Sequence, residues 1–270
     1  MTQELTPFPH PPGGLWDQWG TGRLLLWTAV CLVGNVLVQG VVFALTGDLF
    51  VSAGAGAVIA VLVPCRAVAR AFHGTLASEF ALRRVPPAVL IWTAVAAAAS
   101  LAPTSELAGL SQRITPLPSD WVDLYAKHLP RSPAAIAVAY AVVAVIVPPA
   151  EEILFRGLLQ RIAARFWGTV PAVVLAALVF ALLHGEPWFL FGLAGLGLLL
   201  GFLFATTRSL VPGIVAHGLH NAVALTALLR EGPQAAAAGD GSTPAWLLPA
   251  SIAVLALACW RIARLGRRRS

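Results

Sequence analysis

Long apolar runs separated by short polar connections are the feature that most restricts how this chain can fold. A helix needs about 20 mostly apolar residues to cross a membrane, where only helices and closed barrels satisfy the backbone. Charged residues make up 11% of the 270 residues, against about 25% in soluble domains, too few to cover a water-exposed surface. The runs that reach or approach a spanning length are residues 24–45, 49–64, 87–101, 133–150, 170–184, 189–206, 212–229 and 245–260. The sequence therefore predicts an all-α fold, a polytopic transmembrane helix bundle with about eight spans, or six or seven if a short run is re-entrant.

The distribution of basic residues predicts the orientation of this bundle. Basic clusters alternate along the chain with the connections 104–132 and 230–244, which are balanced in charge. With eight spans, every basic cluster falls on one side, which the positive-inside rule makes cytoplasmic, so both termini are predicted to be cytoplasmic. The net charge of +6 then indicates membrane orientation rather than nucleic-acid binding. The residues of the basic clusters are Arg66, Arg70, Arg83, Arg84, Arg156, Arg161, Arg165, Arg208, Arg261, Arg264, Arg267, Arg268 and Arg269.

Two adjacent glutamates interrupt the apolar chain directly after the fourth run. Ionisable groups at membrane depth cost about 2.5–3.5 kcal/mol each on insertion scales, so they rarely lie there without a role. Glu152 precedes Arg156 by four residues, the favourable order for a helical ion pair, and this pair is predicted to be structural. Glu151 lies about 100° around the helix and is not neutralised by the same contact. Glu151 is therefore the candidate general base; in the alternative, both acids belong to a packing network.

Two later apolar runs carry histidines at helical spacing. Phe180 and His184 are four residues apart, as are His217 and Asn221, so each pair shares one helix face. His220 lies between the latter two and is slightly rotated away. A single intramembrane histidine is often only a hydrogen bonder between helices. Three histidines and an amide in two late helices exceed what packing requires, so we interpret them as candidate site residues.

The spacing along the chain predicts that these groups lie at one depth. Glu151 lies 17 residues before Gly168 and His184 lies 16 residues after it, so in an antiparallel hairpin both are equally far from the turn. His217 follows the start of the seventh run by about one turn and falls in the same cytoplasmic half. We therefore expect one site that opens toward the cytoplasm. The backbone at 185–188 would then turn inside the bilayer, where protein must shield it or a water-filled cavity must adjoin it.

These residue types suit hydrolysis by an activated water. A glutamate with a histidine can hold and deprotonate water, and a second histidine with an amide can donate hydrogen bonds to a tetrahedral oxyanion. The sequence has no His-Glu-x-x-His, Gly-x-Ser-Gly or Gly-x-Gly-Asp motif of the other intramembrane protease types. We therefore infer water-mediated cleavage of a peptide bond. A divalent metal such as zinc, bound by Glu151, His184 and His217, is chemically possible because a His₂Glu set binds zinc, and the spacing leaves this open.

The three motifs, in this order, resemble the CPBP family of intramembrane proteases, which includes the type II CAAX prenyl endopeptidases and bacteriocin-processing, Abi-like proteins. The family pattern is Glu-Glu-x-x-x-Arg, then Phe-x-x-x-His, then His-x-x-x-Asn/Asp on successive helices. This chain has Glu151-Glu152-Ile153-Leu154-Phe155-Arg156, then Phe180-Ala181-Leu182-Leu183-His184, then His217-Gly218-Leu219-His220-Asn221. The similarity covers residues 134–229.

The resemblance implies an intramembrane endopeptidase of the glutamate type, with metal dependence left open. It implies that Glu151 activates water together with His184, and that His217 and Asn221 stabilise the oxyanion. Glu152, Arg156 and Phe180 then take supporting roles, and His220 lies outside the minimal pattern. Eukaryotic members remove the last three residues after a prenylated cysteine, whereas other members are linked to bacteriocin immunity or membrane-protein processing.

With this resemblance, the chain divides into four predicted segments. They are a polar N-terminal segment (1–23), N-terminal transmembrane helices and connections (24–132), a CPBP-like catalytic core (133–230), and a loop, last helix and basic tail (231–270). We expect an integral protein of the bacterial plasma membrane that contacts the lipid bilayer and a membrane-associated or lipid-modified peptide or protein substrate, but no nucleic acid. The alternatives are a non-catalytic immunity or scaffold protein of the same fold and a proton-coupled transporter. The complete residue set disfavours the scaffold, and the lack of internal repeats disfavours the transporter.

Overall fold

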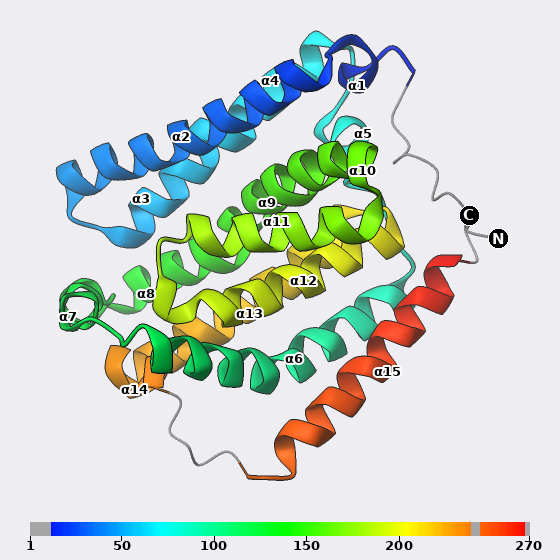
Figure 1. Cartoon of the computed structure of the whole chain (residues 1–270). Helices are drawn as coiled ribbons and strands as arrows, with labels where there is room; N and C mark the ends of the chain where they lie inside the picture. The colour runs from blue at the N-terminus through cyan, green and yellow to red at the C-terminus, as the bar shows by residue number, and fades with distance from the viewer. Residues whose placement is uncertain (1–11, 239–243, 268–270) are drawn as a thin grey trace.

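A computed structural model describes residues 12–238 and 244–267, and over those ranges it contains helices and no strand (Figure 1). Predictions that fall on residues 1–11, 239–243 and 268–270, which include Arg268 and Arg269 of the basic tail, lie outside the described residues. Four short helices lie before or between the membrane-length helices: α1 (Leu15–Gln18), α5 (Leu76–Glu79), α7 (Ser119–His128) and α14 (Pro233–Ala238).

Within the described residues, seven helices are long and apolar enough to cross a membrane. They are α2 (Thr21–Thr46), α3–η1–α4 (Leu49–Ala71), α6 (Pro87–Ile114), α8–η2–α9–η3–α10 (Pro133–Trp167), η4–α12 (Pro187–Thr207), α13 (Leu210–Glu231) and, in α15 (Leu247–Arg267), the stretch Leu247–Gly266. An eighth apolar helix, α11 (Thr169–Leu183), has only 15 residues. Each of the eight predicted runs falls on one of these helices, so the prediction of an all-α polytopic bundle is confirmed.

Two predicted boundaries lie furthest from the observed helix ends, in both cases because a helix continues past polar residues or proline. The fourth run was expected to end at residue 150, yet its helix reaches Trp167. Its charged groups do not interrupt it, since Glu152 and Arg156 neutralise each other along the same helix. The third run was expected to end at residue 101, but α6 continues through Pro103 to Ile114.

The helices are arranged so that the Glu-Glu segment lies in the middle of the molecule. In Figure 1, α2 and α3–α4 form one edge and α15, packed on α6, forms the opposite edge. Between them lie α9, α11, α12 and α13. The largest fully buried side chain among the described residues is that of Arg156, so the centre of the bundle contains a charged group.

Two π-helical segments flank the helix that carries the glutamates. They are η2 (Ala141–Ile146) and η3 (Ile153–Gln160), with α9 (Val147–Glu152) between them. A π-helix pairs each carbonyl with the N–H five residues later instead of four, and such segments are frequent at functional sites. The α9 segment opens with Val147, Pro148 and Pro149, and the two prolines remove two backbone donors from the helix.

The short helix α11 makes the chain turn before it reaches the far face of the bundle. At 1.5 Å per residue, 15 residues span about 22 Å, less than the hydrocarbon thickness of about 30 Å. The turn that follows is covered by α7 and α6. Trp121 Nε1 donates to Glu186 Oε1 at 2.7 Å, and the Phe191 amide donates to the hydroxyl of Ser111 at 2.8 Å. Protein therefore covers part of this turn, while Gly185 and Pro187 are exposed.

Candidate active site

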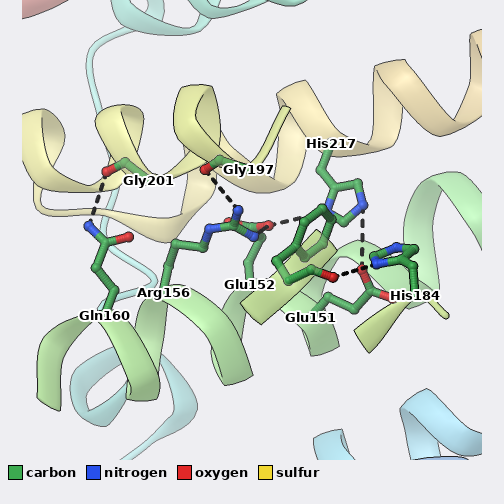
Figure 2. Close-up of polar contacts among 9 residues, drawn as sticks. Glu151, Glu152, Arg156, Gln160, His184, Gly197, Gly201 and His217 are labelled. Atoms are coloured by element: carbon green, nitrogen blue, oxygen red, sulfur yellow. Dashed lines mark hydrogen bonds and ion pairs between the residues drawn. The ribbon is translucent and has the colours of Figure 1, made fainter. Parts of the chain in front are cut away.

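Three helices bring the three sequence motifs together. The Glu-Glu pair comes from the end of α9, Phe180 and His184 come from the end of α11, and His217 lies near the start of α13. Figure 2 shows the carboxylates of both glutamates directed toward His217. Residues more than 60 positions apart in the sequence are therefore in contact.

Glu152 is the centre of a buried polar chain. Its Oε1 accepts a hydrogen bond from Arg156 Nη1 at 2.8 Å, and neither side chain is exposed to solvent. The same oxygen lies 3.1 Å from Nδ1 of His217. Arg156 Nη2 in turn donates to the carbonyl of Gly197 on α12 at 3.0 Å. The predicted contact between Glu152 and Arg156 is confirmed, and the bond to His217 is an addition that helix spacing did not predict.

Glu151 lies on the other side of the same imidazole. Its Oε2 is 3.5 Å from Nε2 of His217, an ion-pair distance that is longer than a good hydrogen bond. The Glu151 side chain is 23% exposed, whereas that of Glu152 is fully buried. The two adjacent acids thus differ as predicted: Glu152 is held by Arg156, and Glu151 has a partly exposed side chain that Arg156 does not hydrogen-bond.

His184 has a defined tautomer. Its Nδ1 lies 2.7 Å from the carbonyl oxygen of Phe180, and a carbonyl can only accept, so Nδ1 carries the proton. In the neutral ring, Nε2 then has a free lone pair that can accept a hydrogen bond from water. His184 and His217 both pack against the ring of Phe180, at centroid distances of 4.5 Å and 5.6 Å. The two histidines therefore share one neighbourhood.

Phe180 is the packing centre of this neighbourhood. It is fully buried, and the Arg156 guanidinium lies over its ring at 4.7 Å. A cation over an aromatic face is attracted by the ring quadrupole, most strongly where water is excluded. Phe180 therefore contacts Arg156 and both histidines at once.

Asn221 and His220 point to different neighbours. Asn221 Nδ2 donates to the carbonyl of Val143 at 2.9 Å, so one of its two amide hydrogens is engaged and the other remains. His220 Nε2 lies 2.7 Å from Oγ of Ser100 on α6. That hydroxyl donates to the carbonyl of Ala97, so it accepts from His220. The role of His220 was open from the sequence, and the structure places it in a bond between α13 and α6.

The residues predicted as metal ligands do not form a metal site in this arrangement. Among the described residues, no three His, Cys, Asp or Glu side chains gather where they could hold a metal ion. Both ring nitrogens of His217 face carboxylates instead of a common centre with His184. Glu151, His184 and His217 thus do not fit a metal ion as they stand.

Comparison with protein families identifies the segment that holds all three motifs. Residues 133–223 match the family model described as type II CAAX prenyl endopeptidase Rce1-like. This segment is Rce1-like. It begins at the first residue of α8 and ends within α13, so it contains both glutamates, both histidines that contact Phe180, and Asn221. No curated protein and no solved structure matches the chain. The suspected resemblance to the CPBP proteases is therefore supported over these residues.

The Rce1-like segment also contains contacts that the sequence did not predict. Gln160 Nε2 donates to the carbonyl of Gly201 at 3.1 Å, one helical turn beyond the bond from Arg156 to Gly197. These two hydrogen bonds lie side by side and both join η3 to α12 (Figure 2). The sequence signal for these bonds was the four-residue spacing of Arg156 and Gln160 on one helix and of Gly197 and Gly201 on the other. In the structure the Gln160 side chain is fully buried.

Proposed function

We propose that this chain is an intramembrane endopeptidase that hydrolyses a peptide bond with a water activated by Glu151 and His184. The observation that supports this most is the division of the acids around His217. Glu152 is neutralised by Arg156 and orients the imidazole, while the Glu151 side chain remains partly exposed beside it. The Rce1-like match supports a CAAX-type intramembrane protease fold, in which such a pair of acids is consistent with a catalytic and a supporting role.

In the proposed reaction, water is held between the carboxylate of Glu151 and Nε2 of His184. Glu151 takes a proton from the water as the oxygen attacks the carbonyl carbon of the scissile bond. The tetrahedral oxyanion is stabilised by the second amide hydrogen of Asn221 and by Nε2–H of His217. The protonated Glu151 then gives its proton to the leaving amine, which restores the carboxylate and completes the hydrolysis.

His217 can donate from both nitrogens only as an imidazolium. Its Nδ1 donates to Glu152, because a carboxylate accepts, and Nε2–H is then directed at Glu151 before substrate binds and at the oxyanion afterwards. The bond from His217 to Glu152 is therefore consistent with His217 acting as an oxyanion donor as well as with a structural role.

We infer a substrate whose scissile bond lies at membrane depth, such as a lipid-modified peptide. The test uses purified protein in liposomes and two peptides of one sequence, in which a cysteine directly precedes the last three residues. One peptide carries a prenyl group on this cysteine and the other does not. We expect release of the last three residues from the prenylated peptide by wild type and not by Glu151→Gln. Equal product from both proteins would overturn the mechanism. Absence of cleavage with intact folding would favour the non-catalytic or transporter alternative.

We further propose that the site opens toward the cytoplasm of a bacterial plasma membrane. In Figure 1 the start of α2 and the ends of α4, α10 and α15 lie on one side of the molecule, and these ends carry the arginine clusters. Single cysteines test this in a variant in which Cys31, Cys65 and Cys259 are replaced by alanine. An impermeant thiol reagent should label Ser119→Cys in intact cells, and Ala71→Cys only after the membrane is opened. The reverse pattern would overturn the orientation.

A further inference from the structure

The carbonyl of Val143 lacks both of the regular donors of its own helix. In an α-helix its donor would be the N–H of Val147, and in a π-helix that of Pro148. The Val147 N–H bonds to the carbonyl of Val142 in η2, and Pro148 has no N–H. A buried carbonyl without a donor is costly, so a partner must come from elsewhere.

The partner is Asn221, whose Nδ2 donates to this carbonyl at 2.9 Å. Because a carbonyl only accepts, the bond fixes which end of the amide faces η2. Nδ2 has two hydrogens, and the second is therefore left in a defined direction on the helix face that Asn221 shares with His217. The freed backbone oxygen thus sets the orientation of an amide that belongs to the three-motif set.

The next carbonyl shows the same effect independently. The α and π donors of Ala144 would be Pro148 and Pro149, and neither has an N–H. Gly218 lies against this oxygen so closely that a Cβ there would overlap it. Two consecutive carbonyls without helical donors therefore both face α13, and α13 approaches them with a donor and with a glycine.

We propose that Pro148 is a positioning residue: by withholding an N–H from Val143, it leaves that carbonyl to orient Asn221 toward the developing oxyanion. The proposal rests on the proposed function for the direction in which the second amide hydrogen acts. The orientation of Asn221 itself does not depend on activity. Both parts can therefore be measured separately.

The first experiment is independent of catalysis. The chain contains two asparagines, Asn35 and Asn221. Protein labelled with ¹⁵N-asparagine gives two side-chain amide pairs in an NMR spectrum, and Asn35→Gln assigns them. Pro148→Ala restores a competing N–H, so the hydrogen-bonded Asn221 proton should move upfield and exchange faster with water. Pro149→Ala is the matched control, because its N–H would reach Val145 or Ala144 and not Val143; its spectrum should keep the wild-type Asn221 pair. An unchanged Asn221 pair in Pro148→Ala would overturn the proposal.

The second experiment measures hydrolysis and tests whether Pro148 acts through Asn221. We expect Pro148→Ala to lower kcat about 10- to 100-fold, up to the loss of one oxyanion donor, with KM unchanged and thermal stability measured alongside. In the Asn221→Ala background the same substitution should cause no further loss, because residues that act through one contact are not additive. An additive loss, or an equal loss in Pro149→Ala, would overturn the proposal. A shifted Asn221 amide in a protein that cleaves no peptide would instead refute the proposed function and leave the positioning of Asn221 intact.

Discussion

Nδ1 of His217 and Oε1 of Glu152 lie 3.1 Å apart, and both side chains are buried, although the two residues are 65 positions apart in the sequence. This contact links the catalytic histidine candidate to Arg156 and, through it, to the backbone of α12. The position of the imidazole therefore depends on a chain of bonds that crosses three helices.

Replacing Glu151 should abolish activity without unfolding the protein. Its side chain is 23% exposed and Arg156 does not hydrogen-bond it. We expect Glu151→Gln to lower kcat by about 10²–10⁴-fold, the usual contribution of a general base, with little change in melting temperature. Peptide hydrolysis and thermal unfolding in detergent measure the two effects. A variant that unfolds far below wild type would show that Glu151 is part of the packing network instead.

Replacing Glu152 should destabilise the fold. Glu152→Ala leaves Arg156 buried without its partner, which typically costs about 3–5 kcal/mol. The matched control is Glu152→Leu with Arg156→Met, in which no charge remains unpaired. Denaturant titration should show a recovery of stability in this double variant but no recovery of cleavage, since His217 still lacks its orienting carboxylate. Wild-type stability of the Glu152→Ala variant would contradict the structural role of Glu152.

The close approach of α12 to α11 should not tolerate a methyl group. A Cβ at Gly197 would lie 2.9 Å from the Cα of Ala177, which is backbone and cannot rotate away. We expect Gly197→Ala to cost about 1–3 kcal/mol through overpacking. Gly109→Ala is the control on α6, because no atom lies within 4 Å of its Cβ, and it should be neutral or slightly stabilising. Equal melting temperatures for both variants would argue against this contact.

Glu186 should make stability depend on pH. Burial raises the pKa of its carboxyl, while the bond from Trp121 and the nearby His184 offset part of that rise. A folded pKa above the unfolded value stabilises the protonated form, so this contribution is present below pH 4.5 and is lost as the pH rises through the folded pKa. Glu186→Gln keeps an oxygen for Trp121 and should remove this decline, measured by thermal unfolding as the pH is raised above 4.5. Asp123→Asn, at an exposed position on α7, should keep the wild-type slope.

Chelators should leave hydrolysis unchanged. Glu151, His184 and His217 do not gather as metal ligands, and both nitrogens of His217 face carboxylates. We therefore expect wild-type cleavage rates after dialysis against EDTA or phenanthroline, with metal content checked by elemental analysis. Loss of activity that added zinc restores would contradict the metal-free reaction.

The sequence predicted those features that depend on spacing within one helix. The pairing of Glu152 with Arg156 follows from four-residue spacing, and the meeting of the Glu151 and His184 helices follows from equal distance to Gly168. The contact between Glu152 and His217 was not predictable, because spacing does not give the rotation of one helix against another. The bond from Asn221 to Val143 depends on a π register that no residue pattern reveals. The roles of the site residues and the division into four segments remain predictions.

The shortness of α11 has a consequence for the lipids beside it. Its outer face presents Val170, Val174, Leu178, Leu182 and Leu183, which are exposed in the folded chain. An apolar face of about 22 Å cannot match a bilayer core of about 30 Å, so hydrophobic mismatch is expected to draw the leaflets together along this helix. His184 directly follows the last residue of this helix. A peptide tethered by a lipid chain would meet the site where its polar backbone has the least hydrocarbon to cross.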